Sequence, residues 1–572
     1  YSLAFLGTWL YSDEKAFVSA QVLPVFEKLK SLTGKGYFEE LVQKYLLDNP
    51  HSSVITLIPS RGLAARKEKA LAQKLQEHLE GLSLEEREEL VRKTKALEEY
   101  QEAPEPEGAE KCIPMLKRED IKKEAAGFYN EPLDVDGSLF LYHQVPTNGI
   151  GYLDLLFDLK GLAPEKVPYL GLLKSVLGYV DTAGYTYGDL TNEINAQTGG
   201  IQCGVEVFEQ ADSIEDYKAF FSLRGKVMYP RIDVLFKMAR EILNTSKLND
   251  TKRLYEIIAE VKSRAQANLV SGGHSTAVLR ASSYSLPMAA FQDAMSGIAY
   301  YQFIEKLEQE FEQRKEQIVE NLELLTREIL RPENLSVSYT GERESLDQVK
   351  KQVKVLRQTL HTEEVERSQE KMSCEKKNEG FMTSGQVQFV AQTGNFRKKG
   401  LSYHGALNIL KVALSYDYLW INLRVKGGAY GCMCGFRRNG ESYFVSYRDP
   451  HLKRTLEVYQ GIPDYVRNFQ ADEREMTKYI IGTISGKDVP KTPQMQGSIS
   501  KTAWFCGITE EMVQKERDEI LQADVEDIRG LAPLIEAILE EKAICVVGSE
   551  TAVQKEKEIF GEIKSLIGSG TV

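Results

Sequence analysis

The run Arg424-Val425-Lys426-Gly427-Gly428-Ala429-Tyr430-Gly431 places one guanidinium and one phenol on either side of a glycine-rich turn. Upstream, leucines at 407, 410 and 414 recur at i, i+3 and i+7, which predicts a helix with one apolar face that continues to Arg424. Glycine tolerates the left-handed backbone found at helix C-termini, so Gly427-Gly428 is expected to end this helix.

A β-hairpin is expected directly after the turn. Residues 430–437 alternate as a strand, Asn439-Gly440 is a strong hairpin signal, and residues 442–447 return antiparallel. Glycines let an extended ligand approach the backbone, and Arg424 and Tyr430 can both donate hydrogen bonds to a carbonyl oxygen. The octet is therefore the candidate site, although a helix C-cap cation and a strand aromatic would satisfy the same pattern.

This octet, with Tyr418-Leu419-Trp420 before it and Ser446-Tyr447-Arg448-Asp449-Pro450 after it, resembles the second half of the pitrilysin/insulinase-type zinc metallopeptidases. The presequence proteases are the most similar branch, and the similarity extends over nearly the whole chain. The resemblance implies that Arg424 and Tyr430 are catalytic, reaching across a closed chamber to hold the substrate backbone beside a zinc ion bound by the other half. It also implies that the substrate is bound by five residues of the run: Arg424, Gly427, Gly428, Ala429 and Tyr430.

The composition is that of a globular chain with several cores. It has 572 residues, of which 42% are hydrophobic. A net charge of −12 argues against nucleic acid as a partner, because nucleic-acid recognition requires a basic face. No run of 18 or more apolar residues and no signal-like start is present, so no membrane partner is expected. Because the sequence begins at Tyr1 rather than at methionine, we expect it to be part of a longer chain.

The seven cysteines are scattered and odd in number, which suits reduced thiols and a cytoplasmic location. Cys432 and Cys434 would share one face of a strand, but zinc needs about four ligands and no second Cys or His pair lies nearby in sequence. They are interpreted as small buried strand residues.

The chain divides into four predicted segments. Residues 1–60 contain an amphipathic stretch, 38–47, and a predicted strand, 54–58, and are interpreted as the C-terminal remnant of a preceding metallopeptidase-like domain. Residues 61–120 form a predicted helical hairpin, with a Ser83–Glu86 capping box, and an acidic linker rich in proline. In the family that this chain resembles, such a hairpin is the hinge between two halves.

Internal repetition organises the remainder. Strand-turn-helix endings recur at 54–75, 335–360 and 544–566, and strand openings recur at 137–142 and 385–390. Residues 121–362 are predicted to be an inactive metallopeptidase-like domain, and residues 363–572 a second such domain carrying the Arg/Tyr motif. The fold class is α+β: two tandem homologous sheet-plus-helices domains of the pitrilysin/mitochondrial-processing-peptidase type.

The zinc motif of the family, His-x-x-Glu-His on a helix, is absent. None of the seven histidines lies within one helical turn of another. Counting back from Asp181-Thr182, the motif positions fall on Leu172, Ser175 and Val176, none of which binds zinc. His274 and His404 are interpreted as loop or helix-capping residues.

Two functions fit these observations. In the first, the chain is the C-terminal half of a zinc-dependent endopeptidase, or peptidasome, that degrades unfolded or short peptides, with its zinc in a missing N-terminal half. This chain alone would bind no metal and be inactive. In the second, it is a metal-free structural or peptide-binding subunit of the same family.

Overall fold

The computed structural model describes residues 2–58, 60, 62–103, 108 and 112–568. Two compact units are distinguished, Tyr1–Pro114 and Met115–Val572. In the first unit, the helices are α1 (Ser2–Trp9), α2 (Val22–Leu32), α3 (Tyr37–Val42), α4 (Leu63–Gly81) and α5 (Leu84–Glu102), with a π-helical segment at Gln43–Leu47. The predicted helical hairpin is therefore present as α4 and α5.

The capping box predicted at the start of α5 is confirmed. The backbone N–H of Glu86 donates to the Ser83 hydroxyl at 3.2 Å, and the Glu86 carboxylate accepts the backbone N–H of Ser83 at 2.8 Å. Most of the acidic linker after α5, residues 104–107 and 109–111, lies outside the described residues.

The strand predicted at 54–58 is wrong. These residues have no regular secondary structure, and Val54 and Leu57 are 96% and 90% exposed. A strand is stabilised by hydrogen bonds to a neighbouring strand, and among the described residues none pairs with this segment. The apolar sequence was therefore insufficient to make a strand.

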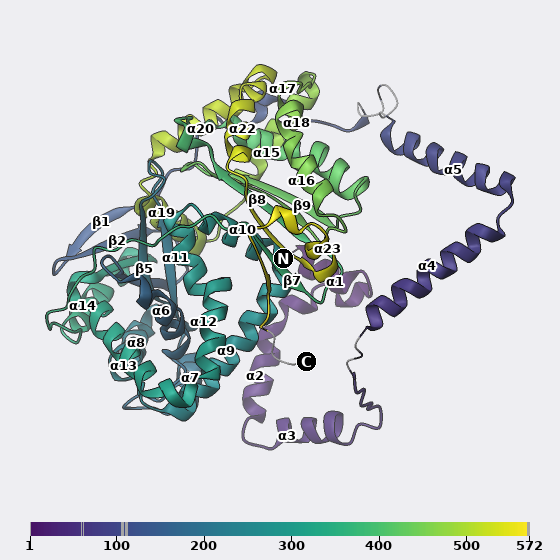
Figure 1. The fold of residues 1–572 in the computed structure, drawn as a ribbon. Coiled ribbons are helices and arrows are strands. Elements are labelled where there is room, and N and C mark those ends of the chain that lie inside the picture. Colours follow the sequence, from purple (N-terminus) through teal and green to yellow (C-terminus); the bar gives the residue numbers. More distant parts are fainter. Residues whose placement is uncertain (1, 59, 61, 104–107, 109–111, 569–572) are drawn as a thin grey trace. The chain divides into compact units, whose positions relative to one another are not determined.

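The second unit contains two six-stranded mixed sheets (Figure 1), here called sheet A and sheet B. Sheet A has the order β1-β2-β6-β3-β5-β4, and sheet B the order β12-β7-β11-β8-β10-β9. The strands of sheet A are β1 (Glu131–Val135), β2 (Ser138–Gln144), β3 (Ile150–Asp158), β4 (Ile201–Glu209), β5 (Tyr217–Met228) and β6 (Leu335–Gly341). Those of sheet B are β7 (Glu379–Thr383), β8 (Phe389–Asn395), β9 (Gly431–Phe436), β10 (Glu441–Tyr447), β11 (Ala543–Ser549) and β12 (Glu562–Ser565).

Helices separate the strands along the chain. Those between 167 and 357 are α6 (Val167–Val176), α7 (Tyr187–Gln197), α8 (Ile232–Thr245), α9 (Thr251–Ser271), α10 (Gly273–Ser283), α11 (Pro287–Ser296), α12 (Ile298–Gln309), α13 (Phe311–Ile329) and α14 (Leu346–Arg357). Those between 406 and 555 are α15 (Ala406–Ala413), α16 (Lys453–Gln460), α17 (Ile462–Arg467), α18 (Glu473–Lys487), α19 (Pro493–Cys506), α20 (Glu510–Gln522), α21 (Val525–Arg529), α22 (Ala532–Glu540) and α23 (Glu550–Lys555). The predicted α+β class is confirmed.

The predicted repeats hold for the strands better than for the helices. The ending at 335–360 is present as β6 and α14, but in the ending at 544–566 the helix stops at Lys555 and β12 follows it. The predicted openings enter their sheets at different positions, because β2 pairs in parallel with β6 whereas β8 pairs antiparallel with β11. The structural counterpart of β2 is β7, which pairs in parallel with β11. The domain boundaries at 121–362 and 363–572 stay a prediction.

Each sheet is covered on one face by a helix from the other half of the unit. Helix α10 packs on strands β8, β10 and β11 of sheet B, and α19 packs on β2, β4, β5 and β6 of sheet A (Figure 1). A separate apolar cluster forms at each contact: Ala277, Ala281 and Phe389 at the first, and Phe208, Phe220 and Phe505 at the second. The two halves are therefore interlocked.

A buried cation accompanies each exchanged helix. Arg280 on α10 donates to Glu379 of β7 at 2.5 and 3.0 Å and to Asp293 at 2.6 Å. Lys501 on α19 is fully buried and donates to Asp154 of β3 at 2.5 Å and to Glu206 of β4 at 2.7 Å. Buried charges of this kind are tolerated because they are paired and hydrogen-bonded.

We expect Lys501→Met to destabilise the protein by about 3 kcal/mol at neutral pH, because two carboxylates would lose a buried partner. Burial alone would raise the pKa of Asp154, but the charges of Lys501 and Arg224 outweigh it and hold the pKa below its ordinary value of 3.8. This carboxylate therefore stabilises the folded state above pH 3.8, and its contribution is lost as the pH falls through its lowered pKa. Urea unfolding of both proteins between neutral and acidic pH measures the difference, which should shrink on acidification.

The matched control is Lys515→Met on α20, where the exposed amine lies 3.7 Å from Glu519. This variant should stay within about 0.5 kcal/mol of the parent chain. Equal effects of the two substitutions would contradict a stabilising role for Lys501.

Candidate functional site

The Arg/Tyr run lies where a long helical segment ends at the edge of sheet B. Helix α15 continues through two π-helical segments, Leu414–Tyr418 and Trp420–Val425, and the chain then turns into β9. The predicted helix, glycine turn and hairpin are all present. Widened π turns are frequent at functional sites, and here the second one carries Arg424.

Both glycines of the turn are required by its geometry. Gly428 has a φ of +76°, the left-handed region, and a Cβ on Gly427 would lie 2.5 Å from the Leu423 carbonyl oxygen. The N–H of Gly428 donates to the Arg424 carbonyl at 2.9 Å, and that of Ala429 donates to the Leu423 carbonyl at 2.8 Å. These two N–H groups are therefore engaged within the turn, and the predicted binding role of Gly427, Gly428 and Ala429 is limited to close approach.

Arg424 is oriented by two aromatic rings and one hydrogen bond. Its guanidinium carbon lies 4.3 Å from the Trp420 ring centroid and 5.2 Å from that of Tyr430. One terminal nitrogen, Nη1, donates to the Tyr430 backbone carbonyl. A guanidinium has five N–H donors, so this arrangement fixes the group while leaving donors for a ligand.

Tyr430 presents its phenol to solvent. The side chain is 64% exposed, and in the described part of the chain its hydroxyl makes no hydrogen bond. Its backbone N–H donates to the Tyr447 carbonyl at 3.0 Å, which fixes the residue beside the first residue of β9. The structure therefore brings the guanidinium and the phenol together, as the sequence predicted.

An aromatic cluster supports Tyr430, and sequence reasoning missed its role. The Tyr447 ring lies 5.9 Å from the Tyr430 ring, 5.4 Å from Phe389 and 5.0 Å from His274. His274 is the second residue of α10, so its ring comes from the other half of the unit, and desolvation lowers its pKa. No sequence pattern connects residues so far apart; only the exchange of α10 places them side by side.

The remaining candidates are structural in their surroundings. His404 accepts the backbone N–H of Ala406 at 3.2 Å and so caps α15, as expected. Burial raises the pKa of the Cys432 thiol to about 11 and that of Cys434 to about 12, so both stay protonated at neutral pH. All seven cysteines are free.

The residues at the zinc-motif positions do not fit a metal. Leu172 and Val176 are fully buried in the core on α6, and the Ser175 hydroxyl donates to the Gly171 carbonyl at 3.4 Å. Within the described residues, no group of three or more His, Cys, Asp or Glu side chains is placed to hold a metal ion. No described helix is long and apolar enough to cross a membrane.

We expect Gly428→Ala to destabilise the protein by about 1 kcal/mol, because an L-residue at positive φ is strained. Gly486→Ala is the matched control, since Gly486 lies within α18 and a Cβ there meets nothing within 4 Å. That control should be neutral or stabilising by up to about 1 kcal/mol. Thermal unfolding of both variants measures this, and a destabilisation shared equally by the two would contradict the assigned role of Gly428.

Comparison with known proteins identifies the architecture. Residues 57–307 match the family of domains associated with peptidase family M16, subfamily C, and residues 378–550 match one described as "PreP C-terminal domain". Protein HypA of Clostridium perfringens is 37% identical over 567 residues, covering 99% of this chain and 58% of that protein. Presequence protease 1 of Arabidopsis thaliana is 29% identical over 583 residues, covering 99% of this chain and 53% of that protein.

A solved structure supports the same fold. The peptidase M16 inactive domain from Pseudomonas fluorescens aligns with a TM-score of 0.50 at 14% identity, covering 73% of this chain and 98% of that one. At this identity the likeness shows the fold alone. The chain spans about half the length of the curated relatives it matches. The family expected from the Arg/Tyr run is confirmed: this chain belongs to the M16 peptidases and corresponds to the C-terminal half of their presequence protease branch.

Proposed function

We propose that this chain is the C-terminal half of a zinc-dependent endopeptidase that degrades unfolded or short peptides inside a closed chamber. The observation that carries the proposal is the pairing of an oriented guanidinium with an unbonded, exposed phenol. Arg424 and Tyr430 present their donors together at the terminal strand of sheet B. The similarity of the whole chain to presequence proteases supports a peptide as the ligand.

The chemistry of the pair suits a peptide carbonyl. Hydrolysis turns the carbonyl oxygen of the scissile bond into an oxyanion, and preorganised donors stabilise that charge. Trp420 and the Tyr430 carbonyl hold the Arg424 guanidinium before substrate arrives, so little reorganisation is needed. The Tyr430 hydroxyl adds a neutral donor with no competing partner among the described residues.

The zinc of the proposed enzyme belongs to the preceding half of the polypeptide. The residues of α6 that occupy the motif positions do not fit a metal, so no step is assigned to this chain's own α6. The partners proposed for this chain are the N-terminal catalytic half and the peptide substrate, and a cytoplasmic location is part of the same proposal.

A second function is a metal-free structural or peptide-binding subunit. It is favoured by the apolar, fully buried residues at the motif positions, Leu172 and Val176. The two functions differ in the polypeptide that carries this sequence. A natural reading frame that continues upstream into a His-x-x-Glu-His helix supports the enzyme, and one that starts near Tyr1 supports the subunit.

In the full-length enzyme, we expect Tyr430→Phe to lower kcat by about 10²-fold, because one transition-state donor is lost while the ring is retained. Arg424→Lys keeps the charge but loses the planar fork, so we expect a comparable loss. Steady-state hydrolysis of a peptide measures kcat and KM separately. A rise in KM alone would assign the residue to binding of the peptide backbone.

Tyr416→Phe is the matched control, since Tyr416 is equally exposed and lies in the preceding π-helical segment. Its kinetic constants should not change. If both site variants also keep kcat and KM within about twofold, far below the loss expected for an oxyanion donor, the pair is structural.

We also expect this chain by itself to hold no stoichiometric zinc and to cleave no peptide. The reason is the residue types at the motif positions, which offer no imidazole. Metal analysis of the purified chain after a chelator wash tests this. One tightly held zinc per chain would contradict it.

A further inference from the structure

Sheet A ends in the same local arrangement as sheet B. Helix α7 is followed by Gly199-Gly200 and then by β4, just as the helical segment after α15 is followed by Gly427-Gly428 and β9. Gly200 has a φ of +108°, and the N–H of Gly199 donates to the Lys226 carbonyl at 2.8 Å. In both sheets a glycine pair therefore feeds the terminal strand.

Strand β4 has one free side. It pairs antiparallel with β5, and in the part of the chain that the structure describes no strand pairs with its other side. Most of its residues are half-buried rather than exposed. Such an edge presents unpaired N–H and C=O groups in a row, to which an extended peptide can add as a further strand.

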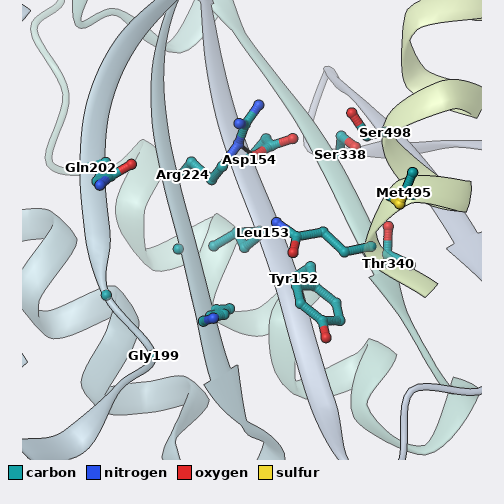
Figure 2. A pocket seen from close by; sticks show the side chains of 14 residues that line it. Tyr152, Leu153, Asp154, Gly199, Gln202, Arg224, Ser338, Thr340, Met495 and Ser498 are labelled. Carbon is teal, nitrogen blue, oxygen red and sulfur yellow. Dashed lines mark hydrogen bonds and ion pairs between the residues drawn. The ribbon is translucent and has the colours of Figure 1, made fainter. Parts of the chain in front are cut away.

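Two cavities lie beside the start of β4. The first, of about 390 Å³, lies between sheet A and α19 and is lined by Tyr152, Arg224 and Met495 (Figure 2). The second, of about 420 Å³, lies against α6, α7 and α9 on the opposite face of the sheet. Gly200 and Gln202 line both cavities. Because successive side chains of a strand point to opposite faces, a peptide along β4 would direct neighbouring side chains toward the two cavities.

The second cavity contains a cation without a counter-charge. Lys174 lines it, is half-buried, and has no carboxylate partner within the described residues; its amine lies 6.0 Å from the Tyr300 ring centroid. Burial lowers the pKa of this amine. The other two cations of the lining are already paired, Arg253 with Glu256 and Arg264 with Glu260. An anion that entered this cavity would offset the cost of burying the ammonium group.

We propose that β4 is a docking edge for an extended peptide segment, one acidic side chain of which enters the second cavity and pairs with Lys174. The peptide chemistry rests on the proposed function, but the site uses neither Arg424 nor Tyr430. It lies on the other sheet of the unit, so this half of the enzyme would hold a substrate at two places. Acidic segments would be preferred at β4.

Direct binding to this chain tests the proposal without any catalysis. The probes are fluorescein-labelled, C-terminally amidated peptides of about ten residues, rich in threonine and valine, with a central Glu or, for comparison, Gln. By fluorescence anisotropy the Glu peptide should bind about tenfold more tightly, as a charge-assisted pair predicts. Lys174→Met should abolish this preference, and Lys351→Met, an exposed lysine on α14, should retain it.

A Glu peptide that is N-methylated on alternate amides, made in both registers, tests strand addition. At least one register should bind about tenfold more weakly, because it cannot donate to β4. No measurable binding, equal affinity for the Glu and Gln peptides, a preference that survives Lys174→Met, or indifference to N-methylation in both registers would each overturn the proposal. Arg424→Lys should leave this binding unchanged, whereas loss of binding in that variant would place the peptide at the Arg/Tyr site instead. Failure of the Arg424 and Tyr430 kinetic tests would leave the β4 result unaffected.

Discussion

The exchange of α10 and α19 between the two halves is the constraint on which the rest of unit Met115–Val572 depends. Each helix brings an apolar cluster and a buried cation onto the opposite sheet, Arg280 to Glu379 and Lys501 to Asp154 and Glu206. A buried charge is tolerated only when its partner is in place, so each half completes the other. The apolar contacts supply stabilisation, and the ion pairs define which residues of helix and sheet must meet.

The same exchange supports the candidate site. Tyr447 packs behind Tyr430, and His274 from α10 packs against Tyr447, so the orientation of the phenol depends on a helix from the other half. A Cβ on Gly273 would lie 2.3 Å from the Phe389 ring, which shows how closely the start of α10 approaches sheet B. Catalytic donors are effective when held rigidly before substrate arrives. The interlocked halves provide that rigidity at the terminal strand of sheet B.

Local patterns in the sequence succeeded where the physics is local. The helix before Arg424, the turn at Gly428, the hairpin after it and the Ser83–Glu86 capping box depend on residues a few positions apart, and all four are present. Patterns failed where a distant partner is needed. Residues 54–58 have strand-forming side chains but no neighbouring strand among the described residues, and the segment after Lys555 forms a strand because β7 lies beside it.

The sequence by itself determined the family and the residues of the candidate site. The Arg/Tyr run is contiguous, and its glycines, aromatic residues and cation carry their conformational preferences wherever they occur. Only the tertiary structure decided what supports Tyr430, which cations are paired, and that β4 has a free edge beside the unpaired ammonium of Lys174. These features arise from contacts between residues far apart in the chain, and no local preference encodes which distant side chain will lie alongside.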